Sequence, residues 1–191
     1  TIKNVNFKGN GISILDFYKV TISECTFNDI TTGNAIYVSA DEYTSSIVVE
    51  NCEMNNIEGA GINFRNPVNA TVKGNKINGT GNNSITFQHG TAYTEAETGE
   101  YIIENNIFQN WANEASEGRA LRIATGVKPR AITIENNVMI KDNAPEEFVK
   151  VTGNTDNVSV DKNYWNGANP TSSNTPAYFL AEGVQVHNYY A

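Results

Sequence analysis

The sequence Ile134-Glu-Asn-Asn-Val-Met139 carries the pattern that decides how this chain folds. Six other segments repeat it, each with an aliphatic first residue, a polar centre and a large apolar end. They are Ile2-Lys-Asn-Val-Asn-Phe7, Ile22-Ser-Glu-Cys-Thr-Phe27, Val49-Glu-Asn-Cys-Glu-Met54, Val72-Lys-Gly-Asn-Lys-Ile77, Ile103-Glu-Asn-Asn-Ile-Phe108 and Val160-Asp-Lys-Asn-Tyr-Trp165. Successive copies of this repeat motif begin 20, 27, 23, 31, 31 and 26 residues apart, and a repeat of this length indicates a solenoid.

Apolar residues alternate with other residues around each motif, as they do in β-strands. Directly upstream lie Val20-Thr-Ile22, Ile47-Val-Val49, Ala70-Thr-Val72, Tyr101-Ile-Ile103, Ile132-Thr-Ile134 and Val158-Ser-Val160. A second set comprises Ile12-Ser-Ile14, Ile36-Tyr-Val38, Ile62-Asn-Phe64, Ile85-Thr-Phe87, Leu121-Arg-Ile123 and Val149-Lys-Val151. With a brief strand around the last apolar residue of the motif, the sequence predicts three strands per coil and about six to seven coils.

Asparagine recurs at the fourth position of the motif. The residues there are Val5, Cys25, Cys52, Asn75, Asn106, Asn137 and Asn163. Stacked at the strand spacing of about 4.8 Å, the four asparagines can bond to one another and to the turn backbone. We also expect them to adopt the left-handed conformation that a sharp corner needs.

These repeats resemble those of right-handed parallel β-helix proteins, the pectate-lyase-like superfamily found in secreted and cell-surface bacterial proteins. The likeness covers Ile2 to Trp165 and implies an all-β solenoid over residues 1–165, with residues 166–191 as an irregular C-terminal cap that buries Tyr164, Trp165, Phe179 and Val186. It also implies a secreted or cell-surface location. The superfamily includes polysaccharide lyases, glycoside hydrolases and non-catalytic adhesins, so the resemblance leaves the activity open.

Composition limits the partners. The chain has 191 residues, 39% of them hydrophobic, which is enough for one domain whose core is a column of inward side chains. The net charge of −8 argues against nucleic acid and anionic membranes, because both select basic surfaces. No apolar run is long enough to form a transmembrane segment. Thr1 enters directly into a repeat, so we expect the chain to be part of a longer protein.

One outward row of side chains predicts a binding face. In the second set of strands the central residues are Ser13, Tyr37, Asn63, Thr86, Arg122 and Lys150, flanked by Arg65 and Gln88. Tyrosine can stack on a sugar, amides and hydroxyls can bond to its hydroxyls, and cations can hold a carboxylate or sulfate. A polysaccharide or glycan is therefore the predicted partner of Tyr37, Asn63, Arg65, Thr86, Gln88, Arg122 and Lys150. An ordinary hydrated β-surface is the alternative.

Two residues of that row are candidates for catalysis. A polysaccharide lyase needs a base near the acidic C–H of the sugar and a cation at the neighbouring carboxylate. Lys150 and Arg122 can take these roles if the guanidinium helps the lysine to lose its proton. A hydrolase of the polygalacturonase type is not predicted, since His89-Gly90 is present but no Asp-Asp pair is.

A further row holds charged residues one position after the start of each motif: Glu50, Lys73, Glu104, Glu135 and Asp161. Stacked in register, Glu104, Glu135 and Asp161 would repel one another, and a bound Ca²⁺ would relieve this repulsion. They are only weak candidates for a calcium site, because the ion prefers about six to eight oxygen ligands. A solvated acidic edge without metal is the favoured interpretation. No other cofactor is expected.

Several features stay open. Cys25 and Cys52 share a corner of neighbouring coils, as buried free thiols or as a disulfide. Trp111 is either a core or lid residue or a sugar platform. Two inserts, residues 39–44 and 88–100, are expected on one side of the solenoid, where binding loops are often found.

The sequence thus predicts a non-catalytic glycan- or macromolecule-binding module, with a polysaccharide lyase as the alternative.

Overall fold

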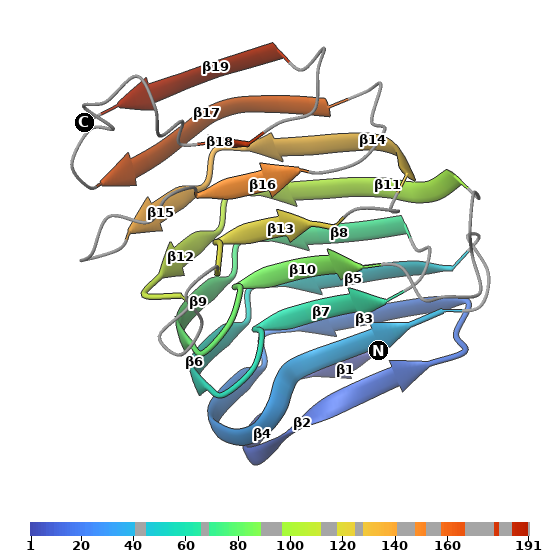
Figure 1. Cartoon of the computed structure of the whole chain (residues 1–191). Coiled ribbons are helices and arrows are strands. Elements are labelled where there is room, and N and C mark those ends of the chain that lie inside the picture. The colour runs from blue at the N-terminus through green and yellow to red at the C-terminus, as the bar shows by residue number, and fades with distance from the viewer. Residues whose placement is uncertain are drawn as a thin grey trace.

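The chain is a stack of parallel β-coils. The computed structural model describes residues 1–40, 45–65, 69–88, 97–111, 118–124, 128–140, 148–151, 158–166, 178–179 and 185–190. Its strands join into one continuous parallel network, in which each coil pairs with the next (Figure 1). Ile2 lies beside Ile22, and Ile22 beside Val49, so equivalent motif positions stack in register. Nothing in the described ranges is a helix of the length and hydropathy that crossing a membrane requires.

The strands form three stacks, one for each side of the coil. The first stack contains β1 (Ile2–Lys3), β3 (Lys19–Ser23), β5 (Ser46–Glu50), β8 (Asn69–Lys73), β11 (Glu97–Glu104), β14 (Lys128–Glu135) and the start of β17 (Val158–Asn166). The second contains the starts of β2 (Asn6–Leu15) and β4 (Thr26–Ser39), then β6 (Glu53–Ile57), β9 (Lys76–Thr80), β12 (Ile107–Gln109), β15 (Val138–Ile140) and the end of β17. The third contains the ends of β2 and β4, then β7 (Ile62–Arg65), β10 (Ile85–Gln88), β13 (Leu121–Ile123), β16 (Val149–Val151) and β18 (Tyr178–Phe179).

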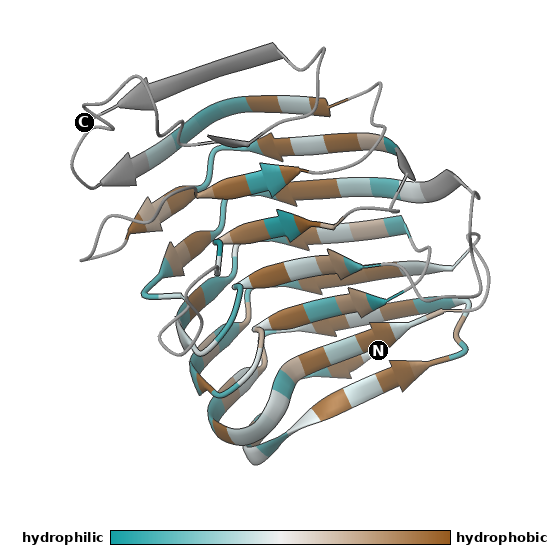
Figure 2. Ribbon diagram, in the orientation of Figure 1, coloured by the Kyte–Doolittle hydropathy of each residue, from teal (hydrophilic) through white to brown (hydrophobic). Residues whose placement is uncertain are grey.

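The core is the column enclosed by the three stacks. Alternation along the strands turns apolar side chains inward, and Figure 2 shows the resulting hydrophobic and hydrophilic bands. The first residue of the motif is fully buried in six coils: Ile22, Val49, Val72, Ile103, Ile134 and Val160. Aromatic rings stack between coils, with centroids 4.7 Å apart for Phe7 and Phe27 and 4.6 Å for Phe64 and Phe87. Each coil therefore covers the apolar face of its neighbour.

The corner between the first and second stacks differs from the prediction in one respect. The left-handed residues occupy the third motif position and not the fourth: Asn4, Glu24, Asn51, Gly74, Asn105, Asn136 and Lys162 all have positive φ. The physical reason is that this residue makes the sharp turn, and the turn directs the following side chain inward. The fourth-position asparagines are consequently buried, at 0 to 1% exposure.

The last described strands continue the parallel pairing. Tyr178–Phe179 pairs with β16, and β19 (Gln185–Tyr190) pairs with β17. Most of residues 166–191 lies outside the described ranges, so an irregular cap there stays a prediction. The expected burial of Tyr164 is wrong, because its side chain points out of the second stack and is 40% exposed. The side chains of Trp165, Phe179 and Val186 lie outside the described part.

Candidate functional site

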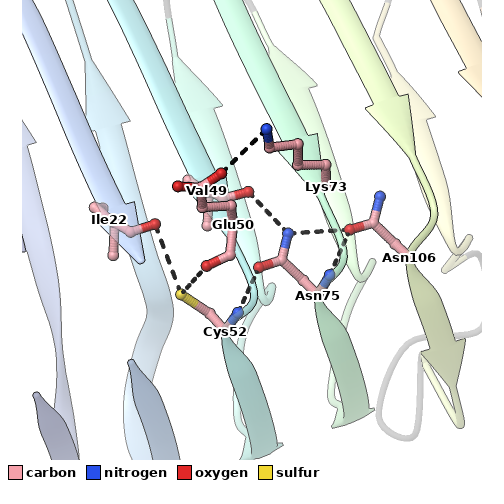
Figure 3. A network of polar contacts seen from close by, with 7 residues as sticks. All are labelled: Ile22, Val49, Glu50, Cys52, Lys73, Asn75 and Asn106. Atoms are coloured by element: carbon pink, nitrogen blue, oxygen red, sulfur yellow. Dashed lines mark hydrogen bonds and ion pairs between the residues drawn. The ribbon is translucent and has the colours of Figure 1, made fainter. Parts of the chain in front are cut away.

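The amide ladder at the first corner is a structural feature. Asn106 donates to the backbone carbonyl of Val72 and to Oδ1 of Asn137, at 2.9 and 3.0 Å. Its own Oδ1 accepts two hydrogen bonds from Asn75, one from the backbone N–H and one from Nδ2, both at 3.0 Å. Asn75, Asn137 and Asn163 repeat this geometry (Figure 3 shows the part around Asn75). The predicted ladder is confirmed. Its amide groups form their hydrogen bonds with one another and with the backbone.

The predicted outward row of the third stack is in register. Consecutive partners across the coils are Ser13, Tyr37, Asn63, Thr86, Arg122 and Lys150. A second row beside it contains Leu15, Ser39, Arg65 and Gln88. Ser39 was expected in the insert 39–44 and not on this row, although its place two residues after Tyr37 predicts the same strand face. Six of the seven predicted ligand-binding residues thus lie on one accessible face.

Thr86 is the exception. It is only 7% exposed, and its hydroxyl accepts a hydrogen bond from Nδ2 of Asn83 at 2.9 Å. Asn83 is itself buried and accepts the backbone N–H of Arg119 at 2.7 Å. The hydroxyl of Thr86 is therefore engaged in the packing between two coils, and the accessible row is interrupted at β10.

The amides next to Thr86 are held in place. Nε2 of Gln88 donates to Oδ1 of Asn63 at 3.0 Å, which links β10 to β7. Both side chains are half-buried, whereas Arg65 is exposed. Because its oxygen is turned toward Gln88, Asn63 directs its Nδ2 group away from that residue. The bond fixes two polar groups at defined positions on the face, which lowers the entropic cost of ordering them around a ligand.

The charge of this face is opposite to that of the chain. Among the described outward positions of the third stack from β4 to β16, Arg65, Arg122 and Lys150 are cationic and none is acidic. Arg122 is exposed, and Lys150 follows it in register one strand spacing away, about 4.8 Å. A chain of net charge −8 therefore presents a local positive stripe, which attracts anionic groups.

The charged row of the first stack is also in register. Lys73 pairs with Glu50 at 3.2 Å, whereas Glu104, Glu135 and Asp161 are consecutive partners of like charge. Asp161 contacts Lys162, whose Nζ lies 3.7 Å from its carboxylate. Within the described residues, no group of three or more His, Cys, Asp or Glu side chains is arranged to hold a metal ion. Ca²⁺ binding by this row stays a prediction without support from the geometry.

Trp111 is a core residue. Its side chain is fully buried and packs edge-on against Phe148, with ring centroids 5.4 Å apart. The alternative of a sugar platform on Trp111 is therefore wrong. Most of the two predicted loop inserts, including Tyr43, Tyr93 and His89-Gly90, lies outside the described residues. Glu100, which is described, forms an ion pair with Arg130 at 3.1 Å.

The comparisons with known proteins agree with this architecture. A family model for the right-handed β-helix region matches residues 1–175. No curated protein and no solved structure matches the chain. The family match covers most of the sequence, and the structure shows the stacked parallel coils that such a match implies. The chain therefore belongs to the right-handed β-helix family.

Proposed function

We propose that this chain is a non-catalytic binding module for an extended anionic glycan, which lies across the coils of the third stack. The observation that carries the proposal is the register of Tyr37, Asn63, Arg122 and Lys150 on four of five successive coils, with the buried Thr86 on the coil between Asn63 and Arg122. Such a row offers an aromatic, an amide and two cationic groups at multiples of the strand spacing, which suits an extended polymer with several kinds of group. We further propose that the protein acts outside the cell, on or near a bacterial surface, where such polymers occur.

The chemistry of the row supports an anionic ligand. Arg122 can bind a carboxylate or sulfate through two parallel N–H donors, and Lys150 adds a second cation beside it. Tyr37 offers an aromatic face for a sugar ring, and the Asn63–Gln88 pair offers amide groups for hydroxyls. The absence of acidic side chains from the described outward positions of this face avoids repulsion of such a ligand.

The experiment measures binding of a linear polyuronate and of a neutral glucan of the same length at low ionic strength. The polyuronate should bind more tightly, and added salt should weaken it. Arg122→Ala should weaken binding by roughly tenfold, the worth of one charge-assisted hydrogen bond of about 1.5 kcal/mol. The matched control is Lys76→Ala, which removes a cation from the second stack, where Lys76 pairs with Glu53 at 3.7 Å. Equal losses for both variants would refute the assignment to the third stack.

A polysaccharide lyase is the second candidate, favoured by the adjacency of Arg122 and Lys150. In this reaction a base removes the proton next to the sugar carboxylate, the guanidinium neutralises that carboxylate, and the glycosidic C–O bond breaks to leave an unsaturated uronate. Ultraviolet absorbance of that product during incubation with polyuronate tests it. Absorbance growth that Arg122→Ala abolishes would establish the lyase, and binding without product supports the module.

A further inference from the structure

The two cysteines form an interruption of the amide ladder. Cys25 and Cys52 occupy the ladder position in consecutive coils, and the residues that follow them, Thr26 and Glu53, are direct strand partners. Both are free thiols, with 1% and 2% exposure. The backbone N–H of Glu53 donates to the carbonyl of Cys25 at 2.9 Å, which fixes the two coils against each other at this point. The two sulfurs are thus neighbours inside the corner.

The two thiols form only weak hydrogen bonds with the backbone. The Cys25 sulfur lies 3.2 Å from the carbonyl of Ser23, and the Cys52 sulfur lies 3.4 Å from that of Glu50. Figure 3 shows Cys52 where an asparagine stands in later coils, with its sulfur also 3.8 Å from the carbonyl of Ile22. An S–H group is a weak donor, so these contacts contribute less than the amide bonds of Asn75. Their sulfurs remain available to a ligand that prefers sulfur.

We propose that Cys25 and Cys52 form a two-coordinate dithiolate site for a soft divalent cation with a filled d shell, such as the mercuric ion. Neighbouring parallel strands are about 4.8 Å apart. Two metal–sulfur bonds of about 2.3 Å, laid end to end, span nearly the same length. The strand spacing of the solenoid therefore matches a linear sulfur–metal–sulfur unit between Cys25 and Cys52.

The charge balance of this complex suits a buried position. Two S–H bonds and the two bonds from mercury to chloride break, two sulfur–metal bonds form, and two protons and two chloride ions leave to the solvent. The two negative thiolates and the divalent cation make a neutral unit, so no net charge is left in the core. A zinc ion prefers four ligands, and calcium and magnesium prefer oxygen ligands. A site with two sulfur ligands therefore suits none of these three ions. The site should therefore select strongly for soft ions.

Entry and proton release set the rate of uptake. Burial, the largest cause, raises the pKa of the Cys52 thiol to about 11, although a backbone hydrogen bond from Cys25 opposes the rise. The Cys52 thiol is therefore protonated at neutral pH, and the ion must displace its proton. Both thiols are almost fully buried, so local opening of the corner must precede entry of the ion. Uptake should be slow and should accelerate as the pH rises.

The test titrates the folded protein with mercuric chloride in a buffer free of thiols. Charge-transfer absorbance reports the sulfur–mercury bonds, and a pH indicator counts released protons. We expect saturation at one ion and two protons per chain, and X-ray absorption should show two sulfur neighbours. Cys25→Ser and Cys52→Ser should each weaken binding on the order of 10² to 10⁴-fold, because the second thiol acts at a high effective concentration.

Zinc chloride at the same concentration is the comparison ion, and it should not compete. Serine keeps a small polar side chain, and circular dichroism of each variant checks that the strands are retained. Two ions bound per wild-type chain, single variants as tight as wild type, competition by zinc or no uptake by the folded protein would each overturn the proposal. The glycan-binding proposal is independent of these outcomes, because the third stack is not involved.

Discussion

Replacing Asn106 with alanine should destabilise the protein more than any surface asparagine substitution. The side chain of Asn106 takes part in four hydrogen bonds of 2.9 to 3.0 Å, all buried. Its removal leaves the backbone N–H of Asn75, one Nδ2 proton of Asn75 and the carbonyl of Val72 without these partners. Oδ1 of Asn137 keeps the bond from the Asn106 backbone at 3.0 Å.

The expected cost follows from the three groups left unsatisfied. A buried polar group without a partner costs about 1 to 3 kcal/mol, so the free energy of unfolding should fall by roughly 3 to 9 kcal/mol. This is a large fraction of the about 5 to 15 kcal/mol typical of a whole domain. A water molecule entering the cavity would move the value toward the lower end of the range.

Urea unfolding followed by circular dichroism measures the change, and Asn78→Ala is the control. Asn78 is half-buried on the second stack and accepts one longer bond, at 3.4 Å, from Asn110. Its substitution should cost less than about 1 kcal/mol. A loss for Asn106→Ala no larger than that for Asn78→Ala would refute the view that the amide ladder stabilises the stacked coils.

Three further predictions concern stability. Cys52→Asn should raise the free energy of unfolding by about 1 kcal/mol, because an amide at this position extends the ladder by one coil; a lower melting temperature would contradict it. The folded-state pKa of Cys52, about 11, lies above the ordinary thiol value of 9.0, so its contribution to the free energy of unfolding is fully present below pH 9 and is lost as the pH rises through 11. Wild type should therefore lose on the order of 2 kcal/mol more than Cys52→Ser across this window, and parallel stability curves would count against it. Gly61→Ala should cost about 1 to 3 kcal/mol, because its Cβ would lie 2.7 Å from Cγ2 of Ile77 and from the carbonyl oxygen of Ser84; an unchanged melting temperature would disagree.

Much of the fold was predictable because each coil repeats a residue pattern that is visible in the sequence. The first motif residue must be apolar to fill the column, and Val72, Ile103 and Ile134 are fully buried as predicted. Asparagine recurs at the corner because it can donate and accept at once. Both patterns repeat at coil length, so the register of the outward rows could be derived from them.

Other features depend on contacts that the repeat does not encode. The burial of Thr86 comes from Asn83, which lies in the turn between β9 and β10 and belongs to no repeated position. The left-handed corner residue has no fixed identity, since Asn51, Gly74 and Lys162 all adopt it. The pattern therefore showed that a sharp turn exists without showing which residue makes it.

The binding face could be predicted only as a row of residue types. Strand alternation placed Tyr37, Arg122 and Lys150 outward, and the register confirms that Arg122 and Lys150 are neighbours. That none of the described outward positions of the third stack from β4 to β16 is acidic depends on how these five strands come together, and no single segment of the sequence shows it. The residue type at this outward position changes from coil to coil, so the repeat that predicts the coils does not identify the ligand.

Nuclear magnetic resonance of the asparagine side-chain amides tests the central claim most directly. The Nδ2 protons of Asn75, Asn106 and Asn137 should exchange slowly with solvent, and each amide should show a nuclear Overhauser contact to the next one along the ladder. The exposed amide of Asn6 provides the rate for an unprotected group. Exchange of the three ladder amides at that rate, without contacts between them, would contradict a core built from stacked coils.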